Sequence, residues 1–166
     1  PQGTITSEPT ELFSEHFHVS IDAGVYVPGD LMERWEGIYR AMETVSGIRF
    51  EDGAYARKIE VRCRANETSE EGEFYVPVAY QNQIDLYPAD LLANGSYAIL
   101  HEMSHTLNYF YHEASEDWES RLMAEGFAEY TAYQTAKWLE ENDPALAYAV
   151  GPSQQILYNV ALEDEE

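Results

Sequence analysis

Hydrophobic and polar residues alternate along the first half of the chain and recur at helical spacing along the second. Alternation over 16–27 and 58–64 predicts two half-buried strands. Shorter strands are expected at 74–80 and 83–87, and Pro77 within the first indicates an edge position, because proline cannot donate to a sheet ladder. Strands with one helix followed by helices alone predict an α+β fold.

One helix is expected between the first strands, beginning after Asp30 and ending at Gly47, with Asp30 and Glu33 forming a capping box. Asn94-Gly95-Ser96 introduces a further helix that runs to about residue 111, and others are expected over about 117–141 and in two short segments after residues 143 and 153. Residues 1–14 are expected to be a loose lead-in, and residues 15–166 a single domain. In that domain a small twisted mixed sheet packs on a helix and a helical C-terminal part follows.

Composition supports one globular domain and restricts its partners. The 166 residues are 45% hydrophobic, which is ample for a core, and the single cysteine, Cys63, excludes an intrachain disulfide. Nine Lys and Arg against 31 Asp and Glu give a net charge of −22, a field that repels nucleic-acid phosphates and anionic lipids. No apolar run reaches the roughly 18 residues of a membrane span. We therefore expect no nucleic-acid partner and no membrane insertion.

The compartment and the oligomeric state are less determined by the sequence. The chain opens at Pro1 without a charged and apolar leader, as it would after removal of a signal peptide. A secreted or cell-envelope location is therefore slightly favoured over a cytoplasmic one, and the oligomeric state stays open.

Residues 101–105, which read His-Glu-Met-Ser-His, carry the clearest chemistry. Positions four apart lie on one face of a helix, so His101 and His105 can offer ring nitrogens to one Zn²⁺, with Glu102 beside them as general base. The residues around them are uncharged, which suits a buried helix. This segment predicts a zinc site.

A catalytic zinc needs three protein ligands and an open position for water. Glu125 and Glu129 are four apart among apolar neighbours, where a carboxylate is costly to bury unless it is paired or binds a metal. We therefore expect Glu125 to be the third ligand. Glu129 is expected to accept a hydrogen bond from the far ring nitrogen of a ligand histidine.

The pattern at 101–105, followed by Glu125 after a gap of nineteen residues, resembles the gluzincin zinc metallopeptidases of the MA clan. The gap is similar to that of the thermolysin branch, whereas segment 124–128 is similar to the aminopeptidase N branch. Tyr148, followed by Ala-Val-Gly, resembles the segment that supplies the catalytic tyrosine of that branch. The resemblance implies a zincin-like fold, one zinc per chain and hydrolysis of a peptide or protein substrate, with Tyr148 stabilising the oxyanion.

One departure from the aminopeptidase branch bears on the mode of cleavage. The Gly-x-Met-Glu-Asn strand that grips the free amine of the substrate in that branch is absent, and Gln83, Ile84 and Asp85 lie in its place. Gluzincins place an edge strand along the cleft there, and an exposed edge can bind an extended peptide as an added strand. We therefore expect these three residues to bind substrate, and internal cleavage rather than trimming from the N-terminus.

The other histidines are weaker candidates for metal ligands. His112 would lie about 10 Å along a continuing helix from His105, too far to share an ion, which disfavours a metzincin-type site. His16 and His18 point to one side of a strand and could bind a metal, but such residues are more often surface or capping groups.

Two further alternatives stay open. Tyr111 and Tyr158 are the alternatives to Tyr148 as the hydrogen-bond donor. The chain has thirteen tyrosines, and packing in the core is the default expectation for any one of them. The chain is also short for the family. A catalytically weak or latent zincin-fold module of a larger protein, with a binding or structural role, is therefore the alternative function.

Overall fold

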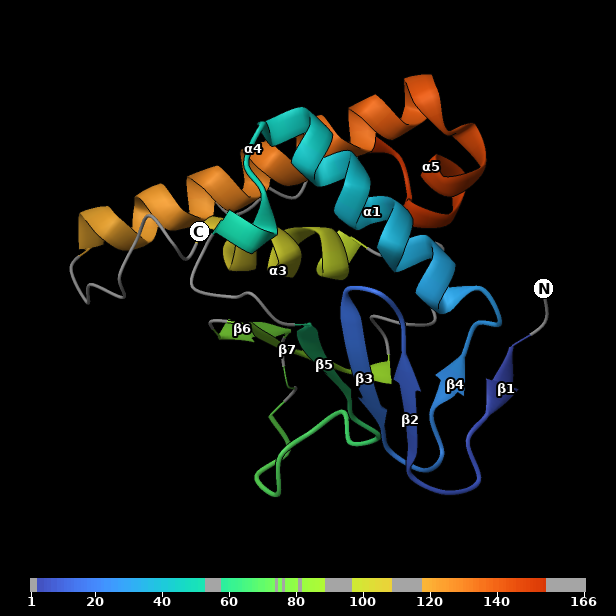
Figure 1. Cartoon of the computed structure of the whole chain (residues 1–166). Coiled ribbons are helices and arrows are strands. Elements are labelled where there is room, and N and C mark those ends of the chain that lie inside the picture. Colours follow the sequence, from blue (N-terminus) through green and yellow to red (C-terminus); the bar gives the residue numbers. More distant parts are fainter. Residues whose placement is uncertain are drawn as a thin grey trace.

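The computed structural model describes residues 3–52, 58–73, 75, 77–80, 82–88, 97–108 and 118–154. Its fold is α+β, as the sequence predicts. The helices lie together on one face of a five-stranded sheet, and a small two-stranded sheet lies beside it (Figure 1). No helix in the described residues is long and apolar enough to cross a membrane.

The larger sheet is mixed, with the strand order β2-β3-β5-β7-β6. Its central strands β3, β5 and β7 are parallel, and β2 and β6 pair antiparallel at the two edges. The strands in this order are Thr10–Phe13, Phe17–Ile21, Ile59–Cys63, Gln83–Leu86 and Val78–Tyr80. The short strand after Pro77 is therefore an edge strand, as predicted.

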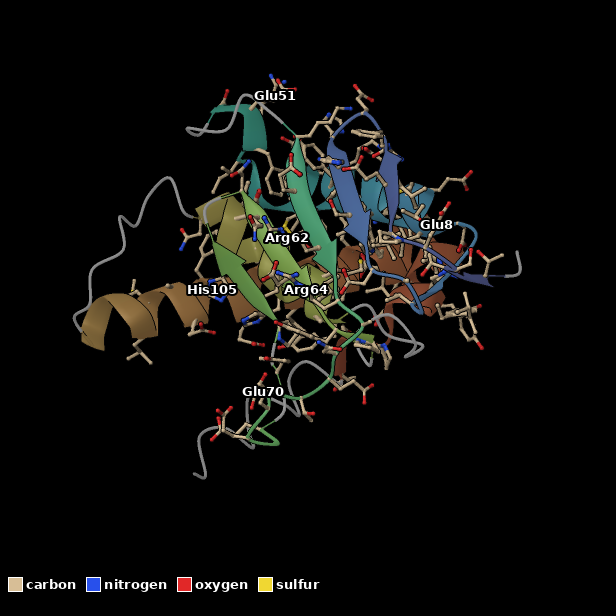
Figure 2. The ribbon with its side chains drawn as sticks, turned by 90° about the horizontal axis from the view of Figure 1, so that it is seen from below. Glu8, Glu51, Arg62, Arg64, Glu70 and His105 are labelled. Atoms are coloured by element: carbon tan, nitrogen blue, oxygen red, sulfur yellow. The ribbon has the colours of Figure 1, made fainter. Side chains whose placement is uncertain are left out.

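Alternation along the strands separates a buried face from a polar one. On β3, Phe17, Val19 and Ile21 are buried, and their intervening residues are only partly covered. On β5, Glu60 and Arg62 alternate with buried residues in the same way. Figure 2 shows Arg62 on the face of the sheet turned away from the helices. The core thus lies between this sheet and the helices.

Two predictions for the N-terminal region were wrong. Segment 1–14 is not a loose lead-in, because it holds β2 and the short strand β1 (Thr4–Ile5). The predicted strand over 16–27 is divided at Gly24, whose φ of +84° favours glycine, and its end forms β4 (Tyr26–Val27), which pairs with β1. Both differences come from pairing between strands, of β2 with β3 and of β1 with β4, which the alternation within one strand does not report.

The described helices are α1 (Leu31–Ser46), a 3₁₀ turn η1 (Phe50–Asp52), α3 (Tyr97–Asn108), α4 (Trp118–Asn142) and α5 (Pro144–Val150). Gly47 ends α1 in the left-handed conformation, as its position predicts. The expected capping box is absent, because the Asp30 side chain makes no cap hydrogen bond and instead pairs with Arg34 at 2.9 Å.

Helix α3 occupies the centre of the molecule. It packs against β6 and β7 on one side and against α4 on the other, with α1 beside it. In Figure 1 these parts lie in layers, with α4 over α3 and α3 over the sheet. A side chain on the α4-facing side of α3 therefore lies at the interface between these two helices.

Candidate metal centre

Four fully buried residues, Ile99, Leu100, Met103 and Leu107, set the rotation of α3 about its axis. His101 lies between them in the sequence, and His105 lies one helical turn further on. Both imidazoles fall on the side that faces α4, and their side chains stay 15% and 20% exposed. The α3–α4 interface therefore contains two adjacent imidazoles within reach of solvent.

Glu125 comes to these imidazoles from α4. Its Oε2 lies 3.2 Å from Nε2 of His101, and its Oε1 lies 3.1 Å from Nε2 of His105. The two Nε2 atoms lie 3.0 Å apart. Among the residues that the structure describes, these three form the group of histidine, cysteine and acidic side chains whose donor atoms converge, all within 4.8 Å of one another.

The donor set fits a zinc ion in both chemistry and spacing. Two imidazole nitrogens and a glutamate are a ligand set of catalytic zinc sites, with bonds of about 2.0–2.2 Å. Tetrahedral geometry with such bonds separates neighbouring ligand atoms by about 3.3 Å. The observed separations of 3.0 to 3.2 Å among the three residues are close to this value.

Glu129 holds the far side of the His101 ring. Its Oε1 lies 2.7 Å from Nδ1 of His101, and its side chain is 13% exposed. The hydroxyl of Tyr97 donates to the same Oε1 at 2.5 Å. A carboxylate on Nδ1 favours the tautomer in which Nε2 carries the free lone pair that a metal requires.

Tyr97 was missed in the sequence analysis. It lies one helical turn before His101 on α3, so helical spacing could have placed it on the histidine face. The ring centroids of Tyr97 and His101 are 5.9 Å apart. Helical spacing within α3 cannot show that Tyr97 contacts Glu129, because this carboxylate comes from α4.

The charges of the site favour a cation. Burial disfavours the imidazolium form of His101, but hydrogen bonds to Glu125 and Glu129 and the nearby charge of Glu102 outweigh this and raise its pKa to about 10. Hydrogen bonds from His101 and His105 hold the pKa of Glu125 well below its ordinary range. A metal that binds His101 must therefore displace a proton, while carboxylates stabilise the metal's charge.

Glu102 is buried beside these ligands, with 6% of its surface exposed. It follows His101 on α3, and its charge contributes to the raised pKa of that histidine. The structure thus brings together the predicted zinc ligands His101, His105 and Glu125, with Glu102 and Glu129 next to them.

Tyr148 does not join them, contrary to the sequence-based prediction. It lies on α5, is 80% exposed, and lines a groove together with Glu140 of α4. A helix rises about 1.5 Å per residue, so α4 separates Glu129 from Glu140 by about 16 Å. Tyr148 is distant because α5 packs against the far end of α4. The alternatives Tyr111 and Tyr158, and also His112, lie outside the described residues.

The predicted substrate strand also needs correction. Gln83, Ile84 and Asp85 belong to β7, which pairs with β5 on one side and with β6 on the other. Ile84 is fully buried in the core, and Gln83 donates to Asp85 at 3.2 Å. The β7 backbone is therefore not available to a peptide, because antiparallel β6 occupies the edge.

His16 and His18 lie beside carboxylates and not beside the proposed metal ligands. Nδ1 of His16 lies 2.6 Å from Oε2 of Glu36. The two ring nitrogens of His18 face two different glutamates, Glu60 at 2.6 Å and Glu11 at 3.1 Å. Because these carboxylates are on opposite sides of the ring, they do not share one centre with His18.

No protein-family model matches this chain, and no curated protein or solved structure matches it either. The interpretation of the site therefore depends on its residues and their geometry.

Proposed function

We propose that this protein is a zinc-dependent peptidase in which His101, His105 and Glu125 hold one Zn²⁺. The observation that carries the proposal is the convergence of these three donors next to a buried Glu102. Two histidines and a glutamate leave one coordination position open for water, which distinguishes a catalytic site from a closed structural one.

A zinc ion bound there would supply a Lewis acid that polarises the scissile carbonyl and lowers the pKa of a water molecule. Glu102 takes the proton of the attacking water on its carboxylate and delivers it to the nitrogen of the leaving amine. The carboxylate of Glu129, whose Oε1 lies 2.7 Å from Nδ1 of His101, would keep Nε2 of that ring directed toward the metal position.

An extended peptide fits the edge of β6 in this proposal. Among the described strands, β6 pairs with β7 alone, and it contacts α3, the helix of the two histidines. A peptide added antiparallel or parallel to such an edge is held by backbone hydrogen bonds and passes beside the helix. Because no amine-gripping motif precedes α3, internal bonds are the expected substrates.

Metal content and turnover of matched variants test the proposal. Glu125→Ala should lose zinc, whereas Glu102→Gln should retain one zinc per chain and lose about 10²–10⁴-fold in cleavage rate. Glu141→Ala, which alters an exposed glutamate on the same helix α4, is the control and should change neither property. Native mass spectrometry measures the zinc, and peptide mapping of an unfolded protein substrate measures cleavage.

The same experiment distinguishes the proposed peptidase from the alternative, a zinc-binding module without peptidase activity. One zinc per chain without cleavage of any protein offered would favour a zinc-binding module with a structural or binding role. Unchanged zinc affinity in Glu125→Ala would contradict the proposed ligand set. Stepwise loss of single N-terminal residues would contradict internal cleavage.

A further inference from the structure

A polar cavity of about 240 Å³ lies at one end of the large sheet, and its lining shares no residue with the proposed zinc site. Asp22 follows the last residue of β3, Arg64 follows that of β5, and Tyr87 follows that of β7. Parallel strands end at the same edge of a sheet, so the fold brings these three together. Figure 2 shows Arg64 at the end of β5.

Two opposite charges line this cavity without neutralising each other. Within the described part of the chain, no oppositely charged side chain lies within 4.0 Å of the charged atoms of Asp22 or Arg64. By contrast, Arg34 and Arg49 pair with acidic residues at 2.9 and 3.1 Å. In a chain of net charge −22, a half-buried arginine without such a carboxylate partner is available to an external anion.

The Asp22 carboxylate is fixed in place. Its Oδ2 accepts a hydrogen bond from the backbone N–H of Ala65 at 3.0 Å, which ties the end of β3 to the residue after Arg64. One carboxylate oxygen is thus used within the protein. The other can accept a hydrogen bond from a ligand.

Two tyrosines form a flat wall of the cavity. The rings of Tyr75 and Tyr87 stack with their centroids 5.2 Å apart and an interplanar angle of 16°, and Tyr75 is 45% exposed. Asn66 adds an amide that can both donate and accept. An aromatic wall with a few polar groups is typical of a small-molecule site.

We propose that this cavity binds a small zwitterion of the free α-amino acid class. The carboxylate of the ligand pairs with the Arg64 guanidinium, its ammonium group with Asp22, and its side chain packs on the tyrosine pair. The cavity volume of about 240 Å³ suits a ligand of the size of one amino acid.

Calorimetric titration with L-phenylalanine and two derivatives tests each charge separately. L-Phenylalaninamide lacks the carboxylate and N-acetyl-L-phenylalanine lacks the ammonium group, so both should bind at least about 10-fold more weakly. Arg64→Gln should lower the affinity of the protein for L-phenylalanine by a similar factor and leave its affinity for L-phenylalaninamide unchanged. Arg64→Lys, which keeps the positive charge, should lower the affinity for L-phenylalanine by a smaller factor.

Two controls locate the binding. His105→Ala removes a donor of the proposed zinc site and should leave the affinity for L-phenylalanine unchanged, so binding of the amino acid to a metal would be recognised. Arg62→Gln changes an exposed arginine two residues away on β5 and should have no effect. If Asp22→Asn fails to fold through loss of the Ala65 contact, the acetyl derivative still reports on the ammonium site.

The proposal would be overturned by three results. They are the absence of saturable binding of L-phenylalanine at millimolar concentration, an unchanged affinity in Arg64→Gln, and acetate binding as tightly as the amino acid. The proposed peptidase activity could fail without any of these results, because the two sites share no residue.

Discussion

Glu129 contacts a proposed metal ligand, His101, and a second residue of α3, Tyr97. One of its oxygens accepts from Tyr97 and lies 2.7 Å from Nδ1 of His101, so the His101 ring faces an acid supplied by α4. Carboxylates in this position fix the histidine tautomer and raise its basicity as a ligand. Tyr97, the first residue of α3, in turn holds this carboxylate in place by donating a hydrogen bond to it.

At this scale we expect Glu129→Ala to lower zinc affinity by about 10–100-fold. Glu129→Gln keeps a side-chain oxygen that can face Nδ1 of His101, so its zinc affinity should fall by a smaller factor. Tyr97→Phe should also lower zinc affinity by a smaller factor, because Glu129 still reaches Nδ1. Competition with a chromophoric chelator measures the dissociation constants. Wild-type affinity in Glu129→Ala would show that the position of His101 is set by packing alone.

At the scale of elements, α1 is joined to the turn between β2 and β3 by one buried carboxylate. Oε1 of Glu36 accepts from Ser14 Oγ at 2.6 Å and from the backbone N–H of His16 at 2.7 Å. Oε2 lies 2.6 Å from Nδ1 of His16, whose ring stacks on Tyr39 with centroids 4.0 Å apart. This contact holds the edge of the sheet to the helix layer.

The pKa of Glu36 predicts how this contact responds to pH. Burial disfavours the carboxylate, but hydrogen bonds from Ser14 and His16 outweigh it and lower the pKa from 4.5. A carboxyl group whose pKa is lower in the folded state stabilises the fold above its unfolded-state pKa, and this stabilisation is lost as the pH falls through the folded-state value.

We therefore expect Glu36→Gln to destabilise the protein by about 1–3 kcal/mol at pH 7. The difference from wild type should shrink as the pH is lowered below about 4.5, the ordinary value for this side chain. Urea unfolding at several pH values measures it, with Glu33→Gln, an exposed position on α1, as the control. A difference that stays constant down to pH 3 would exclude ionisation as its cause.

At the scale of the whole molecule, α1 and α5 are joined although 97 residues, 47–143, lie between them in the sequence. A Cβ atom added at Gly37 would lie 2.6 Å from Cδ2 of Leu146. Glycine in α1 costs helix propensity, but it lets α5 approach α1 closely. The C-terminal helix is thereby part of the same core as the N-terminal half of the chain.

A double-mutant cycle measures this contact. Gly37→Ala should cost about 1–3 kcal/mol through overpacking, partly offset by about 1 kcal/mol of helix propensity. In the Leu146→Ala background the clash is removed, and the same substitution should stabilise by about 1 kcal/mol. If the two free-energy changes add within about 0.5 kcal/mol, the helices do not meet through this pair.

Features that depend on residues close together in the sequence were predictable. Apolar spacing located α1, and residues that favour helix starts indicated α3 and α4. Pro77 indicated the edge strand, and the four-residue spacing of His101 and His105 put both rings on one helix face. Each of these follows from backbone periodicity or from the missing N–H of proline, which act within one element. The α+β class follows from the order of the elements.

Features that depend on contacts between distant segments were decided by the tertiary structure. Pairing with β4 makes β1 a strand, antiparallel β6 encloses β7, and the docking of α5 carries Tyr148 away from His101. The Glu129 contact with Tyr97 and the cavity at the strand ends also arise only when separate elements meet. Periodicity determines which face of an element is buried, but it leaves open the partner against which that face packs, and this is why the sequence alone could not place these residues.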